Sequence, residues 1–166
     1  MNYRPTRDEV GMINAMVTSL RSTCGRKQVG AAIYKDGRPI SAGYAGPPAG
    51  FDHCTPECLH AANANGGCHR TIHAEQNAIA YAARSGRSTE GATLYCTLSP
   101  CTECAKLIIN SGVVRVVYYE QYRITDGIDL LKKANIKCEM LNVNSAILTN
   151  LQNMFASGEK GTLTRK

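Results

Sequence analysis

The sequence predicts an α/β fold in which helices cover both faces of one sheet. The first reason is size, because 166 residues that are 43% hydrophobic and 19% charged fit a single soluble domain. The second is that helix-type and strand-type segments alternate along most of the chain, without an internal repeat or a low-complexity linker. We therefore expect one domain over residues 1–156 and a polar tail over residues 157–166.

The N-terminal part is expected to hold a helix and a hairpin. A capping box at residues 6–9 begins the helix, and apolar residues at helical spacing extend it to about Thr23. These apolar residues are Val10, Ile13, Val17 and Leu20. Asp36-Gly37 favours a type I′ turn because both central residues of that turn need positive φ. Strand-like runs at residues 29–34 and 39–44 flank this dipeptide.

The rest of the chain alternates helices and strands after a long loop. Residues 45–70 lack periodicity, and a loop of this length needs a function or a cross-link. Ser99-Pro100 is typical of an N-cap followed by proline at the first helical position, which predicts a helix from Cys101 to just before Gly112. The other expected helices cover residues 72–84, 126–134 and 146–155, and the other expected strands cover residues 92–97, 113–119 and 137–141.

Composition excludes several classes of protein. The longest purely apolar run, residues 78–83, is far shorter than the ~18 residues that span a bilayer, and residues 1–7 do not resemble a secretory signal. We therefore expect a cytoplasmic protein without a membrane partner. The net charge of +6 suits a phosphate-bearing small molecule or nucleic acid, and equally a slightly basic solvated surface. Eight cysteines without a secretory signal favour metal binding or catalysis over disulfides.

Three residues have the types and spacing of a catalytic zinc site. Cys101 and Cys104 lie three residues apart at the start of an expected helix, so their sulfurs share one face and the positive helix end favours thiolates. His73, which opens the preceding helix, supplies a third ligand. Three protein ligands leave the fourth position open to water, unlike a closed structural zinc site. Glu75 is then placed to act as general base and acid on that water.

The H-A-E segment at residues 73–75 and the P-C-x-x-C segment at residues 100–104 match the general pattern of zinc deaminases. Over about residues 5–142 the chain resembles the deoxycytidylate (dCMP) deaminase family. The segments that carry this resemblance are residues 20–24, 29–31, 43–50, 70–79, 90–95 and 97–112. The resemblance implies a three-layer α/β/α cytidine-deaminase-like fold with a mixed five-stranded sheet. It also implies Zn²⁺-dependent conversion of dCMP into dUMP, a precursor of dTTP.

The resemblance further implies allosteric regulation and assembly. The family binds dCTP as activator and dTTP as inhibitor, with Mg²⁺, in homo-hexamers, and an arginine at the place of Arg84 belongs to its allosteric site. Tyr81 shares a helix face with Arg84, on the side away from Glu75. Without the resemblance, Arg84 fits an ordinary arginine at a helix C-terminus. Ala45 departs from the family, which commonly has a nucleotide-contacting asparagine there.

Six cysteines remain after the catalytic pair. Cys96 and Cys138 fall in strand-like runs and are expected in the core. The other four are expected to hold a second, structural zinc that fixes the long loop, as in relatives, although a histidine could replace one of them. They are Cys24, Cys54, Cys58 and Cys68. Thiols without metal, or a disulfide, are the alternatives.

Other binding residues and functions stay open at this point. Candidates for the substrate phosphate are Arg26, Lys27 and Tyr122, each of which also fits an ordinary surface position. Another cytosine nucleoside or nucleotide, or adenosine in transfer RNA, could be the substrate. Scattered basic residues and the absence of tryptophan argue against nucleic acid. A nucleotide-binding regulatory subunit without activity is the non-enzymatic alternative, but it would not require Glu75.

Overall fold

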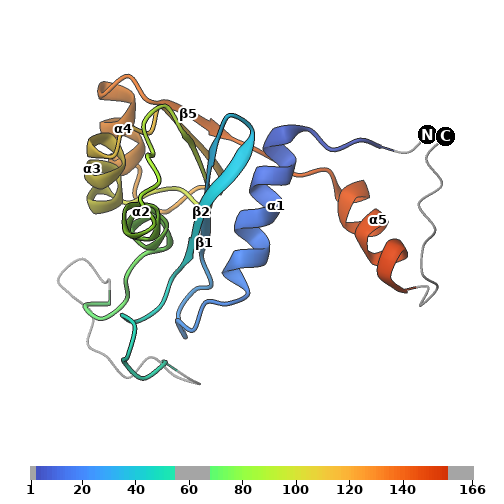
Figure 1. Cartoon of the computed structure of the whole chain (residues 1–166), viewed down its shortest axis with the longest axis horizontal. Helices are drawn as coiled ribbons and strands as arrows, with labels where there is room; N and C mark the ends of the chain where they lie inside the picture. Colours follow the sequence, from blue (N-terminus) through green and yellow to red (C-terminus); the bar gives the residue numbers. More distant parts are fainter. Residues whose placement is uncertain (1–2, 55–67, 157–166) are drawn as a thin grey trace.

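A computed structural model describes residues 3–54 and 68–156 and shows one mixed five-stranded sheet in the order β2-β1-β3-β4-β5 (Figure 1). The central strand β3 pairs antiparallel with β1 and parallel with β4, so the direction of the strands changes in the middle of the sheet. The outer pairs are antiparallel β1–β2 and parallel β4–β5. The strands are β1 (Gly30–Lys35), β2 (Arg38–Tyr44), β3 (Thr93–Leu98), β4 (Arg115–Glu120) and β5 (Lys137–Met140).

Helices cover both faces of this sheet, which confirms the predicted α/β class (Figure 1). Helix α1 (Arg7–Ser19) packs on one face, where its residue Met12 joins Ala32 and Tyr95 of the strands in a core cluster. The other face carries α2 (Ala74–Arg84), α3 (Thr102–Asn110) and α4 (Asp126–Lys133), packed on the strand residues of the opposite parity, such as Ile33 and Leu94. Helix α5 (Ser145–Ala156) stands away from the sheet beyond β5.

All the expected elements are present, and several begin or end elsewhere. Asp36 and Gly37 both have positive φ, at 52° and 72°, as the predicted hairpin turn requires. Helix α1 ends at Ser19, before the expected Thr23. Helix α2 begins at Ala74, because residue 72 pairs with residue 46 in an isolated β-bridge. The expected Ser99 cap is wrong: Cys101 is the N-cap of α3, and the Ser99 hydroxyl instead accepts the Tyr122 N–H.

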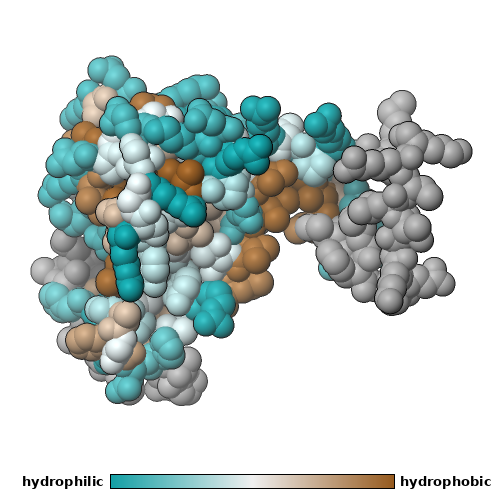
Figure 2. Space-filling view, in the orientation of Figure 1, coloured by the Kyte–Doolittle hydropathy of each residue, from teal (hydrophilic) through white to brown (hydrophobic). Residues whose placement is uncertain are grey.

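The apolar stripe that predicts α1 faces outward rather than into the core. Val10, Val17 and Leu20 are 45%, 58% and 72% exposed, and a hydrophobic patch lies over α1 (Figure 2). The helix instead buries the side that carries Met12, Gly11 and Ala15 against the strands. That choice follows from close approach, because a Cβ at residue 30 would lie 2.1 Å from the Ala15 carbonyl oxygen.

No helix in the described part of the chain combines the length and apolar character needed to cross a membrane.

Candidate active site

The candidate site lies where the N-termini of α2 and α3 meet beside the carboxyl end of β3. His73 is the N-cap of α2, and its backbone N–H donates to the Gln76 side chain at 2.9 Å. Cys101 is the N-cap of α3, and Cys104 lies in that helix's first turn. Two helix N-termini therefore point their partial positive charge at one group of ligands, as thiolates require.

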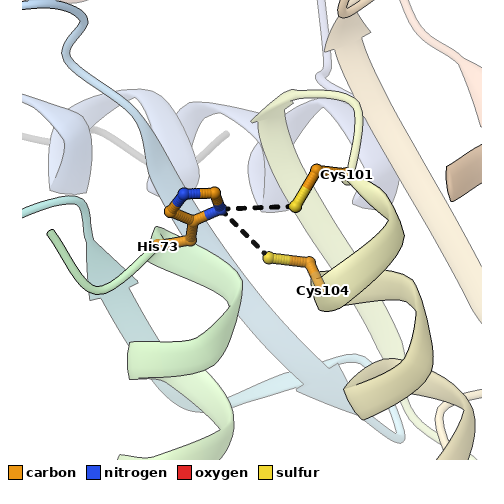
Figure 3. A group of neighbouring side chains, drawn as sticks. All are labelled: His73, Cys101 and Cys104. Atoms are coloured by element: carbon orange, nitrogen blue, oxygen red, sulfur yellow. Dashed lines mark hydrogen bonds between the residues drawn. The ribbon is translucent and has the colours of Figure 1, made fainter. Parts of the chain in front are cut away.

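The three residues predicted as metal ligands come together (Figure 3). His73 Nδ1 lies 3.5 Å from Cys101 Sγ and 3.3 Å from Cys104 Sγ, and all three ligand atoms lie within 4.8 Å of one another. Zinc bond lengths and tetrahedral angles place a sulfur and a nitrogen ligand about 3.6 Å apart. The group therefore fits a tetrahedral zinc ion with one position left for a non-protein ligand, and it is the only such group among residues 3–54 and 68–156.

Protons are shared within this group. A hydrogen bond from Cys104 holds the pKa of Cys101 down to about 3, and the hydrogen bond with Cys101 together with burial raises the pKa of Cys104. The pKa of His73 is raised by its hydrogen bond with Cys101. A metal ion that takes both sulfurs as thiolates must displace these protons, so metal binding is coupled to proton release.

Glu75 lies in the first turn of α2, two residues from His73, and lines the same cavity. It is 4% exposed, and burial raises the pKa of its carboxyl group. A buried carboxyl with a raised pKa takes up and returns a proton closer to neutral pH than an exposed glutamate does.

Two glycines allow the helices to approach the site closely. A Cβ at Gly43 of β2 would lie 2.4 Å from the Ala78 backbone nitrogen, so α2 lies almost directly on the strand. A Cβ at Gly127 of α4 would lie 2.1 Å from the Pro100 carbonyl oxygen, directly beside the Cys101 cap. Neither glycine was predicted from the sequence to have a role.

A cavity of about 300 Å³ opens above the ligand group. Its rim holds the expected phosphate candidates Arg26, Lys27 and Tyr122, together with Arg123, which the sequence analysis missed. The signal for Arg123 was its place directly after Tyr122, just beyond a parallel strand.

Ala45 lies in the wall of this cavity and is 5% exposed. Its N–H donates to the Val29 carbonyl at 2.9 Å, and its carbonyl accepts the Ser22 hydroxyl at 2.6 Å. The backbone is therefore fixed, and a methyl group stands at the position where the resembled family commonly has an amide.

The cysteines predicted for a second zinc lie in different surroundings. Cys24 and Cys68 line the cavity above the His73–Cys101–Cys104 group, and Cys54 is buried in the long loop. The Cys68 sulfur accepts the Arg70 N–H at 3.4 Å. Cys58 lies outside the described residues, so the proposed four-cysteine site stays a prediction. Cys96 is fully buried and Cys138 packs partly buried against the core, as expected.

A second, larger hollow of about 810 Å³ lies at the other end of α2. Tyr81 and Arg84 line it, as does Arg21 from the turn after α1. Among residues 3–54 and 68–156, the Thr23 hydroxyl oxygen at this hollow is buried and has no hydrogen-bond partner. The structure thus places both predicted allosteric residues in one hollow, about three helical turns from His73.

The fold and the site together define a class of protein. A mixed sheet that holds a His–Cys–Cys group and a buried glutamate is the arrangement of hydrolytic deaminases that act on C–N bonds. The model of the family "Cytidine and deoxycytidylate deaminase zinc-binding region" matches residues 5–120. The chain belongs to this cytidine and deoxycytidylate deaminase family.

Individual relatives agree with this assignment. The chain is 39% identical over 157 residues to ComE operon protein 2 of Bacillus subtilis, covering 92% of this chain and 82% of that protein. It is 37% identical to the deoxycytidylate deaminase of Enterobacteria phage T4, covering 82% and 90% of the two chains. A crystal structure of the dCMP deaminase from cyanophage S-TIM5, in complex with dCMP and dUMP, matches with a TM-score of 0.73 and 37% identity over 84% of this chain and 99% of that chain.

Proposed function

We propose that this protein deaminates dCMP to dUMP by hydrolysis. The observation that carries the proposal is the buried Glu75 beside the His73–Cys101–Cys104 group at the base of a cavity with a basic rim. The relatives named deoxycytidylate deaminase, and the cyanophage structure with dCMP and dUMP, support the same substrate. In the reaction, water supplies the new carbonyl oxygen, the bond between the ring carbon and its exocyclic amino nitrogen breaks, and ammonia leaves.

His73, Cys101 and Cys104 would hold the zinc ion, which when bound supplies a Lewis acid that lowers the pKa of a water ligand. Glu75 would take one proton from the attacking water and pass it to the ring nitrogen, and would then carry the second proton of that water to the departing amine. The raised pKa of this carboxyl suits a group that must hold and release a proton in one cycle.

The basic rim would bind the phosphate of the substrate. Arg26, Tyr122 and Arg123 all line the cavity, and the Arg123 guanidinium lies 5.8 Å from the centre of the Tyr122 ring. Lys27 is paired with Glu120 at 2.8 Å, so part of its charge is already balanced. An exposed rim of this kind favours a nucleotide over the uncharged nucleoside.

A substrate screen tests this proposal. Purified protein is assayed for ammonia release from cytosine, cytidine, deoxycytidine, CMP and dCMP, with adenosine-containing transfer RNA as a further arm. We expect kcat/KM to be highest for dCMP. If another cytosine compound or RNA is preferred, that compound and not dCMP is the substrate. If no ammonia is released from any of them, a nucleotide-binding regulatory subunit is favoured.

We also propose a second zinc ion in the Cys24, Cys54, Cys58 and Cys68 region, because two of these sulfurs contact adjacent residues: the Cys68 sulfur accepts the Arg70 N–H at 3.4 Å and the Cys24 sulfur accepts the Thr71 hydroxyl at 4.0 Å. Elemental analysis is expected to give about two zinc ions per chain, and about one in Cys68→Ser. Cys138→Ser is the matched control and should leave the zinc content unchanged. One zinc ion per chain in all three proteins would remove the second site.

Regulation by dCTP as activator and dTTP as inhibitor, each with Mg²⁺, is proposed for the hollow that holds Tyr81 and Arg84. Its size and its arginines suit a nucleoside triphosphate. Arg84→Glu should lose the response of dCMP turnover to either triphosphate, and Arg38→Glu, an exposed arginine that lines neither cavity, should keep it. A wild-type rate that neither triphosphate changes would end the proposal, and an unaltered response in Arg84→Glu would remove that residue from it.

We propose further that the chain assembles with itself, as a homo-hexamer in the cytoplasm. The outward stripe of α1, with Val17 and Leu20 more than half exposed, is an apolar surface of the kind that subunit contacts cover. Light scattering on wild type and Val17→Glu, with Val114→Glu as control, tests both the mass and the role of this surface. A monomeric wild type would contradict the proposal.

A further inference from the structure

Ser99 lines the catalytic cavity although only 3% of its surface is exposed. It lies between the end of β3 and the Cys101 cap of α3. Its hydroxyl does not cap that helix, so the expected structural use of this serine is absent. The partners of this hydroxyl lie in a different segment of the chain.

Ser99 binds three successive residues of the segment that leaves β4. Its backbone N–H donates to the Glu120 carbonyl at 2.8 Å, which extends the pairing of the parallel strands by one residue. Its hydroxyl oxygen accepts the Tyr122 N–H at 2.8 Å and the Gln121 side-chain amide at 3.2 Å. A single buried side chain thus fixes where this loop turns over the cavity.

The loop that Ser99 holds carries the rim of the cavity. Tyr122 and Arg123 both line it, and the Arg123 guanidinium lies over the Tyr122 ring. Glu120, the last residue of β4, is paired at 2.8 Å with Lys27, which also lines the cavity. A displacement of the Tyr122 backbone would move the aromatic ring and the guanidinium together.

We propose that Ser99 is a positioning residue for recognition of the substrate phosphate, acting through the Tyr122 N–H on Tyr122 and Arg123. This inference rests on the proposed function, because it requires a phosphorylated substrate. It assigns Ser99 no contact with the reacting ring atoms. Loss of the hydroxyl should therefore weaken binding of the nucleotide while leaving the chemical step and the zinc ligands unchanged.

The test compares dCMP with deoxycytidine in Ser99→Ala. We expect KM for dCMP to rise about 3- to 10-fold, the range for losing the hydrogen bond from the Tyr122 N–H, since the exposed Gln121 amide can bind water instead. We expect kcat for dCMP and kcat/KM for deoxycytidine to stay within about twofold of wild type. Ser99→Thr, which keeps a hydroxyl, should restore KM. Ser111→Ala is the matched control, because the Ser111 hydroxyl donates a hydrogen bond to the Ile108 carbonyl at the far end of α3.

A double-mutant cycle makes the assignment sharper. In an Arg123→Ala background, Ser99→Ala should raise KM for dCMP by much less than in wild type, because both changes remove the same interaction. Equal losses on dCMP and deoxycytidine, an unchanged KM in Ser99→Ala, additive effects with Arg123→Ala, or loss of zinc would each overturn the proposal. A wild type that does not prefer dCMP to deoxycytidine would instead contradict the proposed function.

Discussion

Glu9 and Glu75 occupy matching places on the two faces of the sheet, and they differ in what surrounds them. Each lies in the first turn of a helix, α1 or α2, and they are 5% and 4% exposed. Glu9 accepts hydrogen bonds from the Thr6 N–H and hydroxyl, the Tyr3 hydroxyl and the Asn144 N–H. Glu75 has Cys104 and its own backbone N–H as partners, and faces the cavity.

The pKa values of the two carboxyl groups consequently shift in opposite directions. The Thr6 backbone N–H, as the largest cause, lowers the pKa of Glu9, and burial raises the pKa of Glu75. Burial alone therefore does not identify a functional carboxylate. A buried carboxylate that accepts a full set of hydrogen bonds stabilises the fold. A carboxylate whose pKa is raised because desolvation outweighs its hydrogen bonds is available for proton transfer.

The largest expected effect tests the Glu75 half of this comparison. Glu75→Gln should lower dCMP turnover by about 10²-fold or more, because general acid–base groups contribute about 10²–10⁴-fold. Zinc content and the free energy of unfolding should stay at wild-type values, since Glu75 is neither a ligand nor a hydrogen-bond hub. Glu103→Gln, an exposed glutamate paired with Lys106, is the control. Near-normal turnover would remove Glu75 from the mechanism.

The reverse pattern is expected at Glu9. Glu9→Ala leaves Thr6, Tyr3 and Asn144 without their shared acceptor, so the free energy of unfolding should fall by about 2 kcal/mol, the sum of a lost cap and lost hydrogen bonds. Turnover of dCMP below the unfolding transition should stay within about twofold of wild type. Urea denaturation and kcat on the same sample measure both. A large loss of activity without a loss of stability would break the comparison.

The pH dependence of the free energy of unfolding is expected to give a smaller effect, and the pKa shifts fix its direction. The pKa values of Glu9 and Asp8 are both lowered in the folded state, that of Asp8 mainly by its hydrogen bonds with Arg115 at 2.7 and 2.8 Å. Such groups stabilise the fold above their unfolded pKa values of about 4 and lose this contribution as the pH falls through the folded values. Urea midpoints should therefore drop below about pH 4, and less steeply in Glu9→Ala. Equal slopes of urea midpoint against pH in wild type and Glu9→Ala would contradict a lowered pKa for Glu9.

Much of the fold could be predicted because the signals are local. The capping box at Thr6, the Asp36-Gly37 turn and the alternation of helices and strands each depend on neighbouring residues. The outward direction of the α1 stripe could not be predicted, because the close approach of Gly30 to Ala15 decides which side is buried. The helix cap at Cys101 escaped prediction for the same reason, since Ser99 is engaged by Tyr122, 23 residues away.

The candidate site divides in the same way. His73, Glu75 and the two cysteines of the metal group lie in two short segments whose spacing already indicates zinc chemistry. Arg123 and Ser99 carry no such motif, because only the parallel pairing of β3 and β4 brings them to one edge. Site residues that lie within a motif can be predicted from the sequence. Site residues that reach the cavity only through strand pairing cannot be predicted until the order of the strands in the sheet is known.

The smallest expected effect concerns a single donor to Glu9. The Tyr3 hydroxyl lies 2.8 Å from both carboxylate oxygens, yet Tyr3 is 38% exposed, so water can replace part of this contact. Tyr3→Phe should therefore lower the free energy of unfolding only slightly, and by clearly less than Glu9→Ala does. In a double-mutant cycle with Glu9→Ala the effect of Tyr3→Phe should disappear, because the acceptor is already gone. A Tyr3→Phe effect of equal size in both backgrounds would show that Tyr3 stabilises the fold without Glu9, and that the Glu9 carboxylate is less fully compensated than its contacts indicate.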